Sequence, residues 1–176
     1  MKKVQIIIAL SIVIIIIASI IYAQLGGTKD IRITKVSTNG YLFIGKKYEG
    51  KRSSKQFGKL MNETADLVKA NQVKGSFAVY HFINPDSEKD TLNSLVGIIV
   101  SDSLQTAPKD YMLKKIPTQE VLQAVLISHW LVSPSPAEVT QKLQAFALSN
   151  GFILGDTILE KYNKDKEIIT EINIKK

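Results

Sequence analysis

The hydrophobic pattern divides the chain into two very different parts. Residues 4–25 contain no charged side chain, and 18 of these 22 positions are apolar. A helix of this length spans about 33 Å, which is enough to cross the hydrocarbon core of a bilayer. A helix on the surface of a soluble domain needs a polar face, and this segment has none. The pattern therefore predicts a membrane anchor over residues 1–25, with one transmembrane span over residues 4–25.

A cleaved signal peptide is the alternative for this segment. Lys2 and Lys3 resemble the basic start of such a peptide, but the apolar run is longer than the usual stretch of about 7–15 residues. Ile21-Tyr22-Ala23 also lacks the small residue that cleavage requires two positions before its last residue. The basic residues on the two sides of the span are nearly balanced. Because the Met-Lys-Lys start resembles a bacterial signal anchor, we expect the domain outside the cytoplasm, with the cytoplasmic side as the alternative.

After a linker over residues 26–30, residues 31–176 show the shorter patterns of a folded domain. Alternation of apolar and polar positions, interrupted by turn signals such as Asn39-Gly40, predicts strands. The predicted strands cover residues 31–36, 41–48, 76–83, 92–101, 111–116, 121–132, 152–162 and 167–174.

Two amphipathic helices interrupt these strands. Each is expected to begin at a capping box, in which a serine is followed three residues later by glutamine or glutamate. The boxes are Ser53–Gln56 and Ser135–Glu138, and the helices end near Asn71 and at Asn150-Gly151. The two helix ends are 79 residues apart, and each half of the domain reads strand–strand–helix–strand–strand. We therefore predict a duplicated α+β fold, in which an antiparallel sheet carries two helices on one face.

The amino-acid composition excludes several classes of function. The chain has no cysteine, which excludes disulfides, thiolate metal sites and a cysteine nucleophile. The formal net charge of +7 is scattered, and no glycine-rich phosphate loop or basic aromatic patch is present. His81 and His129 lie on different predicted strands without a neighbouring carboxylate motif. We therefore expect no metal, no cofactor and no nucleic-acid partner.

The best candidate for chemistry is a carboxylate among aromatic side chains. On the strand over residues 152–162, Ile158, Glu160 and Tyr162 point to the same side. Glu160 is either a solvated rim residue or a carboxylate in an aromatic cleft, where a cationic ligand would compensate its charge. The further candidates for a cleft wall, each of which is also a candidate for the core, are Tyr41, Tyr48, Tyr80, Phe82 and Trp130.

At this point the chain resembles a known family. The duplicated order and four short motifs are similar to the GyrI-like small-molecule-binding domain, also called the bacterial transcription activator effector-binding domain, of the SOUL-like superfamily. The motifs are Tyr48-Glu49-Gly50, Val96-Gly97-Ile98, Glu160-Lys161-Tyr162 and Glu171-Ile172-Asn173-Ile174. The resemblance covers about residues 31–175. It implies a pseudo-twofold axis, helices on one side of the sheet and a ligand cleft on the other. It also implies that Glu160 is the pocket glutamate and Tyr162 its partner.

The chain also departs from this family. An apolar helix stands where a DNA-binding domain would precede the module, which argues against a transcription activator, and each half has one strand more than the family unit. We expect a membrane-anchored, non-enzymatic domain that binds a small hydrophobic or cationic molecule. Two alternatives are a protein-interaction module on the same fold and a hydrolase in which Glu160 acts as general base and a tyrosine as acid.

Overall fold

The computed structural model describes residues 2–27, 30–83, 91–101, 107–127, 132–163 and 167–175. The predicted order of two strand–strand–helix–strand–strand halves is confirmed. The elements are α1 (Lys2–Gln24), β1 (Arg32–Thr38), β2 (Tyr41–Lys51), α2 (Lys55–Lys69), β3 (Ser76–Phe82), β4 (Thr91–Val100), β5 (Met112–Ile116), β6 (Gln119–Ile127), α3 (Pro136–Ser149), β7 (Leu154–Tyr162) and β8 (Glu167–Ile174).

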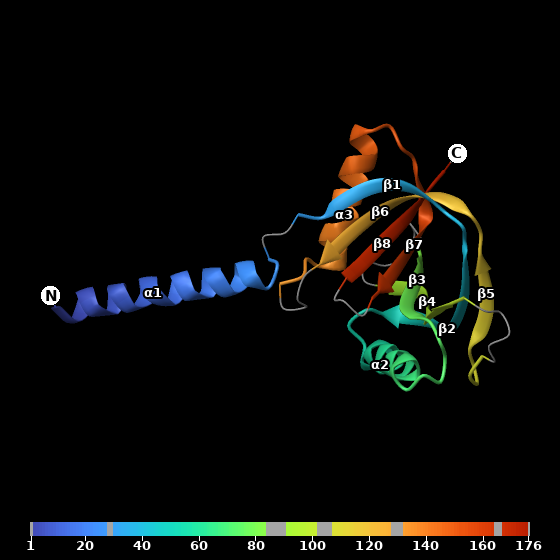
Figure 1. Cartoon of the computed structure of the whole chain (residues 1–176), viewed down its shortest axis with the longest axis horizontal. Coiled ribbons are helices and arrows are strands. Elements are labelled where there is room, and N and C mark those ends of the chain that lie inside the picture. The colour runs from blue at the N-terminus through green and yellow to red at the C-terminus, as the bar shows by residue number, and fades with distance from the viewer. Residues whose placement is uncertain are drawn as a thin grey trace.

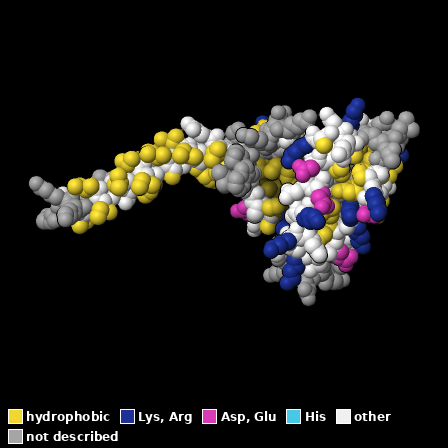
Figure 2. All heavy atoms as spheres, turned by 90° about the horizontal axis from the view of Figure 1, so that it is seen from below, with side chains coloured by type: hydrophobic (Ala, Val, Ile, Leu, Met, Phe, Trp, Pro, Cys, Tyr) yellow, Lys and Arg dark blue, Asp and Glu magenta, His cyan; other side chains and the backbone are white. Residues whose placement is uncertain are grey.

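Helix α1 projects away from the rest of the molecule (Figure 1) and carries apolar side chains along its length, whereas the folded body mixes charges of both signs (Figure 2). Its described side chains are exposed. The helix over Val4–Gln24 is long and apolar enough to cross a membrane, a test that a signal sequence also passes.

The eight strands form one antiparallel sheet in the order β1-β6-β8-β7-β3-β4-β2-β5. β3 and β7 lie at its centre. Outward from β7 follow β8, β6 and β1, and outward from β3 follow β4, β2 and β5, which are the equivalent strands of the other half. The first strand of each half pairs with the other half, since β1 pairs with β6 and β5 pairs with β2. This exchange makes each half incomplete without the other, so the duplicated sequence forms a single sheet.

Both helices pack on the same face of the sheet, which confirms the predicted α+β class. α2 packs on β2, β3 and β4, and α3 packs on β6, β7 and β8. The predicted capping box of α3 is present, with Ser135 and Glu138 each bonding the other's backbone. The N-cap of α2 is Ser54 and not Ser53 as predicted, because the hydroxyl of Ser54 is the one that accepts the hydrogen bond from the Phe57 N–H at 3.0 Å.

Most predicted strands differ from the structure by one or two residues at an end, and β2 and β6 differ more. β2 continues to Lys51, beyond the predicted end at Tyr48, because its last residues pair with the start of β4. β6 is described only to Ile127, so the predicted continuation through residues 128–131, with His129 and Trp130, lies outside the described residues. The predicted loop over residues 84–90 lies outside them as well.

The opposite face of the sheet has its own buried cluster. Phe43, Tyr80, Leu95, Ile116 and Leu159 pack there without any residue of α2 or α3. The sheet is strongly curved (Figure 1), and this curvature brings the side chains of neighbouring strands together on that face. The molecule therefore has two separate interiors, one between sheet and helices and one on the helix-free face.

Candidate functional site

Glu160 lies near the middle of the sheet, on the face that carries the helices. Its side chain is buried, with 6% of the residue exposed. The hydroxyl of Tyr162, two positions along the same strand, donates a hydrogen bond to Glu160 Oε2 at 2.7 Å. The family resemblance implied a cleft on the side away from the helices, but the alternation of β7 puts Glu160 on the helix side. The sequence pattern correctly placed Glu160 and Tyr162 on one face.

His81 is the nearest basic side chain to Glu160 among the described residues, and it was not among the residues predicted for the site. Its Nε2 lies 3.6 Å from Glu160 Oε2, while its Nδ1 lies 2.7 Å from the hydroxyl of Ser94. Nε2 is buried and has no hydrogen-bond partner in the described part of the chain. The pairing of β3 with β7 brings these groups together, since His81 is opposite Ile158, diagonal to Glu160. Neither strand sequence alone specifies that register.

The surroundings keep Glu160 ionised. Burial by itself would raise the pKa of the Glu160 carboxyl. The contact with His81 and the hydrogen bond from Tyr162 act in the opposite direction, helped by the charge of Arg52, and hold this pKa below its ordinary value. Burial and the charge of Glu160 raise the pKa of Tyr162, so its phenol stays protonated and remains a donor.

Two hollows meet at Glu160. The larger, of about 520 Å³, is lined by polar groups that include Arg52, His81, Asn93 and Gln141. The smaller, of about 280 Å³, is mostly apolar; its walls include Leu126, Val139 and Ile168, and Glu160 is its one charged lining residue among those described. Ser135 and Pro136, at the start of α3, border both hollows. Together they have the size of a small-molecule site.

The structure does not bring the seven predicted site residues together. Tyr162 lines the smaller hollow and Phe82 borders the larger one. Tyr48 lies on the helix face, but its hydroxyl donates to the Lys51 carbonyl at 2.7 Å and its ring packs on Phe57, so it fixes the start of α2. Tyr80 and Tyr41 lie on the helix-free face. Trp130 lies outside the described residues.

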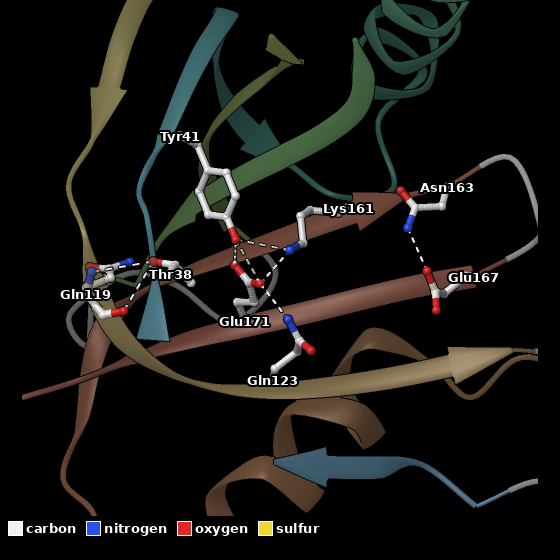
Figure 3. Close-up of polar contacts among 8 residues, drawn as sticks. All are labelled: Thr38, Tyr41, Gln119, Gln123, Lys161, Asn163, Glu167 and Glu171. Atoms are coloured by element: carbon white, nitrogen blue, oxygen red, sulfur yellow. Dashed lines mark hydrogen bonds and ion pairs between the residues drawn. The ribbon is translucent and has the colours of Figure 1, made fainter. Parts of the chain in front are cut away.

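Tyr41 belongs instead to a second polar cluster, on the helix-free face (Figure 3). The carboxylate of Glu171, only 2% exposed, accepts hydrogen bonds from Tyr41 at 3.0 Å and from Gln123 at 2.8 Å and forms an ion pair with Lys161. The Lys161 ammonium also lies over the Tyr41 ring. Burial and the charge of Glu171 raise the pKa of Tyr41. Each charge in this cluster has a partner, so it holds β2, β6, β7 and β8 together.

No group of three or more metal-ligating side chains comes together in the described part of the chain.

Comparison with known proteins concerns the fold alone. No family model and no curated protein sequence matches the chain. Among solved structures, the C-terminal domain of EcmrR has a TM-score of 0.60 at 12% identity, over 83% of this chain and 98% of that one. The integron cassette protein VCH_CASS2 of Vibrio cholerae has a TM-score of 0.55 at 11% identity, over 82% and 97%. A hydrolase from Listeria innocua has a TM-score of 0.53 at 9% identity, over 82% and 92%. The chain therefore has the α+β fold that its resemblance to GyrI-like domains predicted.

Proposed function

We propose that residues 31–176 form a small-molecule-binding domain whose ligand is a hydrophobic cation, with Glu160 as its charge partner. The observation that carries this proposal is a buried, ionised carboxylate at the junction of two hollows. Among the described residues, no lysine or arginine lies within ion-pair distance of Glu160. Folding has already removed the Glu160 carboxylate from water. A cation that binds beside it therefore gains the electrostatic attraction without a further cost for desolvating the carboxylate.

The lining of the smaller hollow defines the ligand class. Its walls are aliphatic side chains and prolines, and burial of an apolar ligand surface against them is worth about 25 cal/mol per Å². Arg52, His81 and Gln141 in the larger hollow can accommodate a polar extension of the ligand. An aromatic or branched apolar body with one positive charge fits this arrangement.

Hydrolysis is the second candidate, since Glu160 has an imidazole and a phenol beside it. The solved structure from Listeria innocua with this fold is described as a hydrolase. A general base works best when its pKa is near the working pH. The lowered pKa of Glu160 makes it a weak base, which favours binding over catalysis.

We also propose that α1 stays attached as a single-pass anchor, with residues 26–30 as a linker to an extracytoplasmic domain. Its length exceeds that of a typical signal-peptide core. Protease treatment of intact cells and of inverted membrane vesicles should degrade the domain only in intact cells. A shorter mature protein that lacks residues 1–25 would contradict the anchor.

The binding proposal is tested with two probes of nearly equal shape. Methyltriphenylphosphonium carries a positive charge, and triphenylphosphine oxide is neutral. Because the phosphonium charge is attracted to the carboxylate without a hydrogen bond, we expect the full-length protein in nanodiscs, measured by titration calorimetry against empty nanodiscs, to bind the cation about tenfold or more tightly than the neutral probe. Glu160→Gln should remove this preference, whereas Glu49→Gln, at an exposed site, should retain it. Equal binding of both probes by the wild type would contradict the proposal, and release of product from an ester panel would favour hydrolysis.

The lowered pKa of Glu160 also predicts how stability depends on pH. A carboxyl whose pKa is lower in the folded state stabilises the fold above its unfolded pKa, near the ordinary value of 4.5, and this contribution is lost as the pH falls through the folded pKa. Urea unfolding at pH 7 and at pH 3.5 should therefore show a smaller loss of stability in Glu160→Gln than in the wild type. An identical loss in both proteins would show that Glu160 does not titrate as described.

A further inference from the structure

A groove of about 420 Å³ lies on the helix-free face, at the ends of β2, β3, β4 and β5. Its lining includes Phe82, Leu95 and Met112, with Lys47 and Lys114 beside them. None of the described residues that line it is acidic. This groove shares no lining residue with the smaller hollow at Glu160 and lies on the other side of the sheet from it, while Phe82 and Asn93 border both the groove and the larger hollow.

The internal duplication shows what is unusual about this groove. In the second half, Glu171 on β8 is opposite Leu159 on β7 and Gln123 on β6. In the first half, the matching position on β4 is Leu95, which is opposite Tyr80 on β3 and Lys47 on β2. The second half therefore has a buried carboxylate with its own lysine, whereas the first half has lysines beside a leucine.

Within the described residues, the charge of Lys114 is compensated only by aromatic rings. Its ammonium lies 4.9 Å from the centre of the Phe82 ring and 5.6 Å from that of Tyr80. Among the described residues, no carboxylate lies within ion-pair distance of Lys114, and Lys47 makes only an exposed pair with Glu49. Such cation–ring contacts are weaker than a desolvated ion pair, so an anion placed beside Lys114 would add to them.

A second, independent feature points to a ligand. Asn93 borders the same groove, and its side-chain oxygen is buried without a hydrogen-bond partner among the described residues. A buried amide oxygen without a partner destabilises the fold, because it has lost its hydrogen bond to water without a replacement. This oxygen accepts a hydrogen bond and a carboxylate cannot donate one, so the missing partner would be a water molecule that donates to both Asn93 Oδ1 and the carboxylate of the ligand.

We propose that this groove binds a small amphiphilic organic anion, a carboxylate on an aromatic or short aliphatic body. The carboxylate lies beside Lys114, in the role that Glu171 has beside Lys161 in the other half, and the apolar body lies on Phe82, Leu95 and Met112. This site has Lys114 as its charge partner, whereas the proposed cation site has Glu160; the groove shares Phe82 and Asn93 with the larger hollow at Glu160 and no residue with the smaller one.

The test uses 2-naphthoate and its neutral amide with the full-length protein in nanodiscs of zwitterionic lipid. We expect 2-naphthoate to bind about tenfold more tightly than the amide. Lys114→Gln should remove this difference, whereas Lys115→Gln, exposed on the same strand and pointing to the other side, should leave it unchanged. Leu95→Glu should abolish binding of 2-naphthoate by supplying an internal carboxylate; if that variant fails to fold, the two lysine variants still decide the question.

Three results would overturn this inference. They are no binding of 2-naphthoate to the wild type, equal binding of acid and amide, and equal losses in Lys114→Gln and Lys115→Gln. Glu160→Gln should bind 2-naphthoate like the wild type, and methyltriphenylphosphonium should not displace it. These controls separate a failure here from a failure of the cation proposal.

Discussion

Lys161→Met is expected to lower the free energy of unfolding by about 3–5 kcal/mol. The substitution removes the ion-pair partner of Glu171 and leaves a carboxylate that is only 2% exposed without a compensating charge. The hydrogen bonds from Tyr41 and Gln123 remain, but neither brings a positive charge. Methionine keeps the length of the lysine stem, so packing is nearly unchanged and the loss reports the charge.

Chemical denaturation of the full chain in detergent micelles, followed by circular dichroism, measures this loss. The double variant Lys161→Met with Glu171→Leu should recover most of it, because a matched apolar pair replaces a buried ion pair at little cost. Lys35→Met breaks the surface pair with Glu120 and should cost less than about 1 kcal/mol. Similar values for Lys161→Met and Lys35→Met would show that the Glu171 cluster is solvated.

Leu143→Ala should cost about 2–5 kcal/mol. Leu143 is fully buried at the centre of the contact between α3 and the sheet, where it packs with Leu122, Val139 and Ile172. Truncation removes apolar contacts and leaves a cavity that a curved sheet and a capped helix cannot close completely. Because α3 borders both hollows at Glu160, the same variant should also weaken binding of a ligand there.

Leu148→Ala is the matched control for this prediction. Leu148 is on the same helix and is 85% exposed, so its truncation should change stability by less than about 0.5 kcal/mol. Both variants make the same Leu→Ala change in the same helix, so they differ in how deeply the leucine is buried. A loss below about 1 kcal/mol for Leu143→Ala would contradict the described packing of α3.

Local patterns in the sequence determined most of the secondary structure. Alternation defined eight strands, since each strand has one face in an interior, and the Ser135–Glu138 capping box defined the start of α3. These signals act over three to eight residues and do not depend on the rest of the chain. The same local character explains the one-residue error at α2, because Ser53 and Ser54 are both suitable caps and only the backbone of the preceding turn selects Ser54.

The alternation of β7 likewise determined that Glu160 and Tyr162 share a face, and that Lys161 points to the other side. The separation of Lys161 from Glu160 then follows from the sequence. The partner of Lys161 does not, because Glu171 approaches it only through the pairing of β7 with β8.

The tertiary structure alone decided which residues surround each carboxylate. The register of β3 against β7 places His81 beside Glu160, and the exchange of β1 and β5 between the halves supplies the two edge strands of the sheet. Tyr41 and Tyr80 are aromatic residues of the kind that line a cleft, but the alternation of side chains along their strands puts them on the face away from Glu160. Strand order, register and helix side depend on contacts between residues distant in the sequence, which no local pattern encodes.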